Sequence, residues 1–203
     1  MRLSLTRLGP TLASHAGAMI TKFEDRRQAG RVLGFLLAEY RKSNHAIVLA
    51  LAGGGVPVGY EVARALSVPL DVFDHETGEV PSAGRRHRSG FELPSIKGNA
   101  VILVDDGLAT GASMMAAVHA VRPLCPESIV VAVPVAAPEA CRELSRTADK
   151  TVCATTPQPF SSVREWYRRF EQTSDEEVQS LLRKARLERM PESVVEPRAA
   201  LYG

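Results

Sequence analysis

The stretch that decides the fold is residues 101–113, which read VILVDDGLATGAS. Its four branched apolar residues are typical of a buried parallel strand. Two adjacent carboxylates, Asp105 and Asp106, follow the strand directly. Like charges at the end of a buried strand are costly unless a ligand binds them. A pair of ribose hydroxyls, or a hydrated Mg²⁺ in contact with such hydroxyls, would satisfy both carboxylates.

Small and hydroxyl-bearing residues come next, where we predict the start of a helix over 112–122. The free backbone amides and the positive dipole end of a helix suit a phosphate. Gly111 lets the backbone approach that phosphate closely, and Thr110 and Ser113 add hydroxyl donors. A purely local alternative is that Asp106 opens an Asx-turn and Thr110 caps the helix. That alternative explains the joint pattern of acids, hydroxyls and glycine less well.

Apolar runs alternate with helical patterns along the rest of the chain, which predicts a parallel sheet covered on both faces. In such sheets the ligand site lies beyond the carboxyl ends of the strands. This rule directs attention to Gly53–Gly55, to residues 74–99 and to the segment after Val104. The predicted strands are 46–51, 68–73, 101–104, 129–133 and 151–154. The predicted helices are 58–66, 112–122 and 138–146, with one more after Asp25 and a last one opened by Ser174. The helix after Asp25 has an apolar face made of Val32, Leu33, Leu36, Leu37 and Tyr40.

Composition narrows the class of protein. The chain has 203 residues, a net charge of +2 and 45% hydrophobic residues, which is ordinary for a globular domain. No apolar run is long enough to span a bilayer, and the small net charge gives no reason to propose nucleic acid as a partner. Three cysteines, an odd number without metal-ligand spacing, favour a reducing compartment and no structural zinc. We therefore expect a cytoplasmic protein without a membrane or nucleic-acid partner.

The chain divides into one domain and two ends. Residues 1–22 contain bases but no acid, yet their apolar run is too interrupted for a secretory signal, so we interpret them as an N-terminal extension, expected to be disordered. Residues 23–188 form the predicted domain. Residues 189–203 lack periodicity and predict a disordered tail.

The run 101–113 resembles the 5-phosphoribosyl-1-diphosphate (PRPP) signature of type I phosphoribosyltransferases. Residues 23–30, 54–58, 132–136 and 156–177 resemble further motifs of a subgroup of predicted, poorly characterised phosphoribosyltransferases. The resemblance implies an α/β, parallel-sheet, Rossmann-like fold. It also implies a small C-terminal helical hood, and here a shortened insertion after the second strand.

The resemblance also implies roles for individual residues. Asp105 and Asp106 would be the catalytic pair and hold the ribose 2′- and 3′-hydroxyls, while Mg²⁺ would be held near them through PRPP and water. The expected reaction is displacement of pyrophosphate from C1 of the ribose by a nitrogen acceptor. The remaining PRPP contacts would come from Gly107, Ala109, Thr110, Gly111, Ala112 and Ser113 at the 5-phosphate and from Gly53, Gly54 and Gly55 at the pyrophosphate.

Two departures from the subgroup concern the pyrophosphate side. An arginine usually precedes the paired glycines, but residues 51–55 read LAGGG. A guanidinium facing a diphosphate is a large charge-assisted contribution, which backbone amides replace only in part. The insertion after the second strand is reduced to residues 74–99. Its basic residues Arg85, Arg86 and Arg88 either close over the diphosphate as a lid or form a solvated run beside the acids of the same loop.

Two other functions remain open. The missing arginine and the short insertion also fit a PRPP- or nucleotide-sensing module without turnover. The spacing of Gly53, Gly55 and Gly59 after a strand fits, less well, a dinucleotide-binding oxidoreductase. Pro57 is unfavourable for that fingerprint, and a dinucleotide site gives Asp105 and Asp106 no role.

Aromatic residues gather at 160–170, within the segment where the resembled fold places its acceptor. Trp166 and Phe170 have helical spacing and are expected to pack in the core. Phe160 and Tyr167 are the candidates for stacking on an acceptor. The sequence does not define the acceptor, and it leaves the oligomeric state open, with a homodimer as one option.

Overall fold

A five-stranded parallel sheet forms the centre of the computed structural model, which describes residues 22–74, 77 and 95–189. The strand order is β2-β1-β3-β4-β5. Ala50 in β1 pairs with Val104 in β3 and with Val72 in β2, so these strands end side by side. The strands are β1 Ala46–Leu51, β2 Leu70–Phe73, β3 Ala100–Val104, β4 Ser128–Val135 and β5 Lys150–Thr155. The predicted α/β fold is therefore confirmed.

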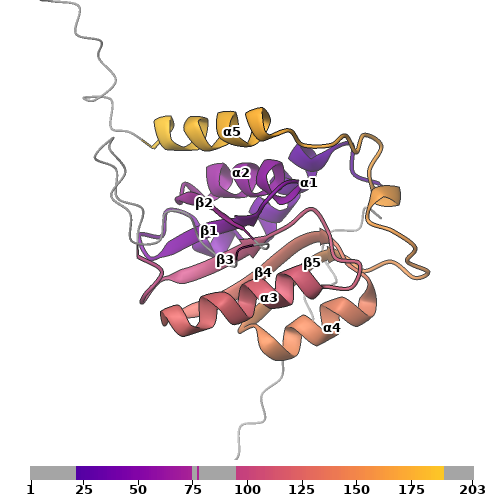
Figure 1. Cartoon of the computed structure of the whole chain (residues 1–203), viewed down its shortest axis with the longest axis horizontal. Coiled ribbons are helices and arrows are strands. Elements are labelled where there is room, and N and C mark those ends of the chain that lie inside the picture. Colours follow the sequence, from indigo (N-terminus) through magenta and orange to yellow (C-terminus); the bar gives the residue numbers. More distant parts are fainter. Residues whose placement is uncertain (1–21, 75–76, 78–94, 190–203) are drawn as a thin grey trace, which may run out of the picture.

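Helices cover both faces of this sheet (Figure 1). One face is covered by α1 Arg26–Leu36, α2 Gly55–Leu66 and α5 Asp175–Leu187, and the other by α3 Ala112–Val121 and α4 Pro138–Thr147. Each strand from β1 to β4 is almost completely buried, and its alternate side chains enter the two separate cores. Within the described ranges, no helix is long and apolar enough to cross a membrane.

The apolar face of α1 differs from the prediction. Asp25 caps the helix as expected, accepting a hydrogen bond from the Gln28 amide at 2.8 Å, but Leu36 is 42% exposed. Leu33 and Leu37 are buried as predicted, and the buried face also contains Gly30 and Gly34, which lie against α2. A Cβ on Gly30 would lie 2.5 Å from the Val58 carbonyl oxygen. At Gly30 and Gly34 the two helices approach too closely for a side chain, a geometry that apolar periodicity alone does not indicate.

The segment between β5 and α5 returns to the start of the domain. Phe23 and Tyr167 form an isolated parallel bridge, in which the Phe23 amide donates to the Trp166 carbonyl at 2.8 Å and the Arg168 amide to the Phe23 carbonyl at 2.9 Å. Only Arg164–Trp166 is helical here, as a single 3-10 turn. The expected helical spacing of Trp166 and Phe170 is therefore wrong, because backbone pairing with residue 23 holds the chain extended.

The last helix begins as predicted. The Ser174 hydroxyl accepts a hydrogen bond from the Glu177 amide at 3.2 Å. The Glu177 carboxylate lies 3.8 Å from the Arg27 guanidinium of α1. The cap therefore also contributes a link between α5 and α1.

A disulfide joins Cys141 in α4 to Cys153 in β5, and Cys125 is free and exposed. The odd number of cysteines favoured a reducing compartment, where structural disulfides are uncommon, and so gave no reason to expect this bond. The pairing depends on the packing of α4 against the edge strand, which spacing in the sequence does not reveal.

Candidate functional site

The turn after β1 and the acids after β3 meet at the carboxyl edge of the sheet. A Cβ on Gly54 would lie 2.1 Å from Oδ2 of Asp106, and a Cβ on Gly55 would lie 3.1 Å from Oδ1 of Asp105. Any side chain at these positions would displace a carboxylate. The structure thus brings together Gly53–Gly55 and the Asp105–Asp106 pair, as the strand order requires for β1 and β3.

Burial and mutual repulsion act on the two carboxylates. Desolvation and the neighbouring charge of Asp106 raise the pKa of Asp105 well above its usual range, although the Asp106 amide donates to its Oδ1 at 2.8 Å. Desolvation also raises the pKa of Asp106, and the hydrogen bond from Arg26 opposes this rise. These paired acids are therefore held in an environment that disfavours their charge, as expected for groups awaiting a ligand or cation.

Arg26, the first residue of α1, is the cation of this site. Its Nε donates to Oδ2 of Asp106 at 2.8 Å, and the two side chains are only 12% and 15% exposed. Its guanidinium lies over the Phe170 ring, 3.9 Å from the centroid. Sequence reasoning placed Arg26 in the opening helix but did not assign it to the site. One feature of the sequence pointed in this direction: residues 51–55 contain no cationic side chain, so a guanidinium near the glycine turn has to come from another segment.

Tyr167 has a different position from the one predicted. It is 5% exposed, its ring packs 5.6 Å from that of Phe23, and its hydroxyl donates to the Asp106 carbonyl oxygen at 2.6 Å. A ring so enclosed cannot stack on an acceptor, so that expectation is wrong. Tyr167 instead fixes the backbone of the acid pair. Phe160 is partly buried against the same aromatic cluster.

The start of α3 follows the acids after a short turn. Gly111 precedes the helix with φ +77°, a left-handed conformation that favours glycine, and Thr110 and Ser113 are exposed. The Ala112 amide donates to the Thr110 hydroxyl oxygen at 3.3 Å, but the N-cap residue is Gly111, so Thr110 does not cap the helix as the local alternative expected. Ala109 and Ala112 are exposed beside them. The small residues leave the first turn of the helix accessible to an anion.

Gly107 links the acids to the returning C-terminal segment. A Cβ there would lie 2.6 Å from Cγ1 of Val163 and 3.0 Å from Cγ1 of Val135. Gly107 has no room for a side chain because Val163, from the segment between β5 and α5, packs directly on it. This contact explains why Gly107 sits between the acids and the anion-accessible turn without itself facing solvent.

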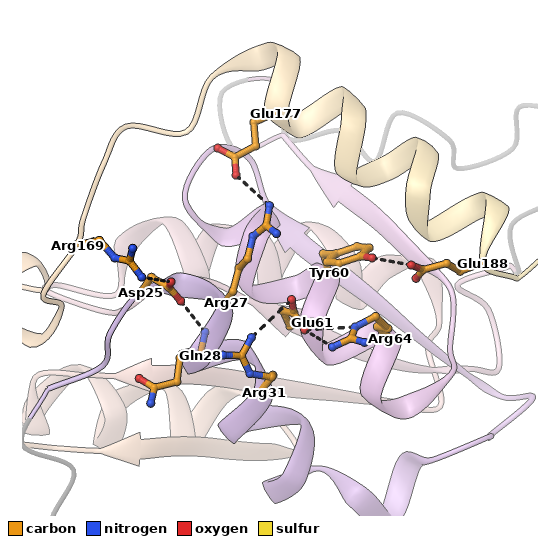
Figure 2. Close-up of polar contacts among 10 residues, drawn as sticks. All are labelled: Asp25, Arg27, Gln28, Arg31, Tyr60, Glu61, Arg64, Arg169, Glu177 and Glu188. Atoms are coloured by element: carbon orange, nitrogen blue, oxygen red, sulfur yellow. Dashed lines mark hydrogen bonds and ion pairs between the residues drawn. The ribbon is translucent and has the colours of Figure 1, made fainter.

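A polar cleft of about 190 Å³ lies beside Arg26. Its walls come from the beginning of α1, from α2 and from the segment leading into α5, and Figure 2 shows Asp25 and Arg169 paired at one side of it and Arg27 reaching toward Glu177 at the other. Arg169 approaches Asp25 at 3.1 Å. The lining residues are Asp25, Arg26, Arg27, Pro57, Arg169, Glu171, Gln172, Thr173 and Glu177. The cleft extends the site from the acid pair toward α5.

The predicted lid residues Arg85, Arg86 and Arg88 lie outside the described residues. A magnesium ion fits the donors that are described. Asp105 and Asp106 offer the carboxylate oxygens that Mg²⁺ prefers, and among the described residues no third His, Cys, Asp or Glu joins them in a cluster. Two carboxylates alone leave most of an octahedral shell to water and ligand oxygens, which suits an ion bound together with a phosphorylated substrate.

The fold and the geometry define an α/β protein with its candidate site at the carboxyl edge of a parallel sheet. Residues 19–168 match the family described as phosphoribosyl transferase domain, and the chain belongs to this family. The Mycobacterium tuberculosis protein Rv0571c, whose name assigns it provisionally to the phosphoribosyl transferases, is 32% identical over 208 residues, covering 80% of this chain and 47% of its own length. The chain thus spans about half the length of the curated relatives it matches.

Two further similarities are to a solved structure and to a curated enzyme. The solved structure of TT1426 from Thermus thermophilus superimposes with a TM-score of 0.68 at 34% identity, covering 80% of this chain and 98% of that one. Orotate phosphoribosyltransferase from Sphingopyxis alaskensis is 36% identical over 101 residues, about half of each chain. The family membership leaves a dinucleotide-binding oxidoreductase without support.

Proposed function

We propose that this protein binds PRPP with Mg²⁺ and transfers the phosphoribosyl group to a nitrogen acceptor, releasing pyrophosphate. The observation that carries the proposal is the contact between the glycine turn and the acid pair. Gly54 and Gly55 lie so close to Asp106 and Asp105 that a diphosphate on the turn and a ribose on the acids would be neighbours. PRPP joins these two groups through C1 of its ribose.

Each part of the site has a task in this proposal. The carboxylates of Asp105 and Asp106 accept hydrogen bonds from the two ribose hydroxyls and orient the ring. The amides at the start of α3, with Thr110 and Ser113, bind the 5-phosphate. Backbone amides of Gly53–Gly55 bind the diphosphate. Bound Mg²⁺ would neutralise diphosphate charge and so assist its departure.

The reaction breaks the bond between C1 and the diphosphate oxygen and forms one between C1 and the acceptor nitrogen, which loses a proton. Positive charge develops on the ribose in the transition state, and two carboxylates below the ring would stabilise it. Positioning and electrostatic stabilisation would supply most of the acceleration. The raised pKa of Asp105 predicts that activity falls as pH decreases, since its protonated form loses the charge that the site uses.

A PRPP-sensing module is the second candidate, and the glycine turn favours it. Residues 51–55 have no cationic side chain, so the binding of a departing diphosphate at the turn depends on backbone amides and on charges from other segments. An enzyme and a sensor would both bind PRPP. Only an enzyme would convert it with an acceptor.

The test is a coupled assay of pyrophosphate release with PRPP and Mg²⁺, run across purines, pyrimidines and other amines. We expect release that depends on one class of acceptor and that the Asp105→Asn variant loses. Release without dependence on any acceptor would be hydrolysis. Binding of PRPP without release for every acceptor would favour the sensor over the enzyme.

A further inference from the structure

The Arg26 side chain is held at the acid pair by contacts with two segments, the acid pair itself and residues 170–171. Its Nε donates to Asp106 at 2.8 Å, its Nη1 donates to the Glu171 carbonyl oxygen at 2.5 Å, and its guanidinium stacks on Phe170 at 3.9 Å. Stacking and two hydrogen bonds fix the plane of the guanidinium. A long exposed arginine would lose considerable side-chain entropy on binding an anion, whereas this one is already ordered.

The guanidinium also lies against the glycine turn. A Cβ on Gly54 would lie 3.1 Å from the Nε of Arg26. The turn itself, residues 51–55, contains no charged side chain. A diphosphate bound by the amides of this turn would therefore meet the guanidinium of Arg26, which comes from another element of the fold.

Arg26 has donors left for such a ligand. A guanidinium carries five N–H groups, and the contacts within the described part of the chain use two of them. Arg26 also lines the polar cleft of about 190 Å³, so part of it borders open space. Unused donors on an immobilised cation are suited to the paired oxygens of a phosphate group.

We propose that Arg26 binds the diphosphate of PRPP and so supplies, from the first turn of α1, the positive charge that the glycine turn lacks. The inference rests on the proposed function. In the free protein Arg26 pairs with Asp106. With PRPP bound, its remaining N–H groups contact diphosphate oxygens, and the charge that develops as the diphosphate leaves is stabilised by the same guanidinium.

The simpler explanation is that Arg26 only fastens α1 to Asp106 and to residues 170–171. The two explanations differ in which ligand they affect. A fastening role would alter every ligand of the acid pair equally, because it acts through Asp106. A diphosphate-binding role affects PRPP and spares ribose 5-phosphate, which has the same ribose hydroxyls and 5-phosphate but no diphosphate.

The experiment is calorimetric titration of the full chain with PRPP and, separately, with ribose 5-phosphate, each with Mg²⁺. The variant is Arg26→Gln, and the matched control is Arg31→Gln. Arg31 lies on the same helix, is half-exposed and has its guanidinium 3.9 Å from the Glu61 carboxylate of α2 (Figure 2). Both substitutions remove one charge from α1, and thermal unfolding of each variant establishes beforehand whether it is folded.

We expect Arg26→Gln to weaken PRPP binding by about ten- to a hundredfold, the loss expected for charged hydrogen bonds. Ribose 5-phosphate binding should change no more than about threefold, within the same range of net hydrogen-bond effects. Arg31→Gln should leave both unchanged. Should Arg26→Gln fail to fold, Arg26→Lys is read by the same comparison, since it keeps the charge and loses the planar fork.

Unchanged PRPP affinity in a folded Arg26 variant, or equal losses for the two ligands, would overturn the inference and leave the proposed function standing. A loss of PRPP affinity equal to that of Arg31→Gln would also overturn it, because the effect would then be one of net charge. If the unaltered protein binds neither ligand, the proposed function itself fails, and the inference fails with it.

Discussion

At the scale of single residues, the site combines two acids whose pKa values are raised by burial with a cation that opposes this rise for one of them, Asp106. Asp106 has Arg26 as a partner at 2.8 Å, whereas the one hydrogen bond to the Asp105 carboxylate from the described residues comes from the Asp106 amide. Buried charges without a counter-ion destabilise a folded protein. Asp105 is therefore the residue where function and stability oppose each other most strongly.

The raised pKa of Asp105 has a consequence for stability. Its folded pKa lies above the unfolded value, so between the two values the folded chain holds more protons and stability falls as pH rises. Asp105→Asn removes this penalty. We expect its advantage over the unaltered protein to grow as pH rises from about 4 to about 8, measured by urea unfolding.

Asp149 provides the control because its pKa is shifted the other way. Hydrogen bonding by the Ile129 amide lowers the pKa of Asp149, opposed by partial desolvation and helped by Arg122. A lowered folded pKa stabilises above the unfolded value, and the stabilisation is lost as pH falls through the folded pKa. Asp149→Asn should therefore be less stable than the unaltered protein at neutral pH and approach it in acid. Parallel pH profiles for the two variants would contradict both assignments.

Individual site residues could be predicted where their immediate sequence neighbours indicate their role. Asp105 and Asp106 stand out because they are adjacent acids after a buried strand, and Gly54 stands out in a run of glycines. Arg26 and Tyr167 could not be assigned in this way. Their contacts to Asp106 span 80 and 61 residues of sequence, and nothing in their immediate neighbours indicates the acid pair.

At the scale of elements, helix α1 carries Arg26 at its first residue, and the packing of α1 against α2 sets the position of α1. The two helices meet through Gly30 and Gly34, whose absent side chains allow the close approach. A shift of α1 away from α2 would move the guanidinium away from Gly54. We therefore expect the position of the Arg26 guanidinium to depend on this helix contact.

Gly30→Ala tests this dependence. The new Cβ would lie 2.5 Å from the Val58 carbonyl oxygen and 2.7 Å from the Glu61 Cβ, and neither backbone nor Cβ can move cheaply. We expect a loss of about 1 to 3 kcal/mol in the free energy of unfolding, as for other overpacked interfaces, measured by urea unfolding. The control is Phe35→Ala on the same helix, where the side chain is 74% exposed and little should change. Equal effects of the two substitutions would contradict the close packing of α1 on α2.

Strand positions were predictable from apolar runs because every buried strand of a parallel sheet is apolar along its length. The β1 prediction of 46–51 is confirmed, and the other four strands differ from their predictions by at most two residues at either end. The segment 156–174 was not predictable by periodicity. Its conformation depends on hydrogen bonds to Phe23 and Glu24, at the opposite end of the domain.

At the scale of the whole molecule, the beginning and end of the domain close the site together. The Phe23–Tyr167 bridge joins residues far apart in sequence. Asp106 accepts hydrogen bonds from Arg26, which precedes it in the sequence, and from Tyr167, which follows it. The acids, the glycine turn and the α3 start come from the middle of the sequence. The fold class followed from the middle segments alone, but the complete site requires both ends of the domain.

The central claim is that the acid pair and the facing glycine turn are a PRPP site. Calorimetric titration with PRPP and Mg²⁺, comparing the unaltered protein with the Asp105→Asn/Asp106→Asn double variant, tests it most directly. Thermal unfolding first establishes that the double variant is folded. We expect saturable binding of one PRPP per chain to the unaltered protein and none to the folded double variant. Equal affinity in the two proteins, or no binding to the unaltered protein, would contradict it.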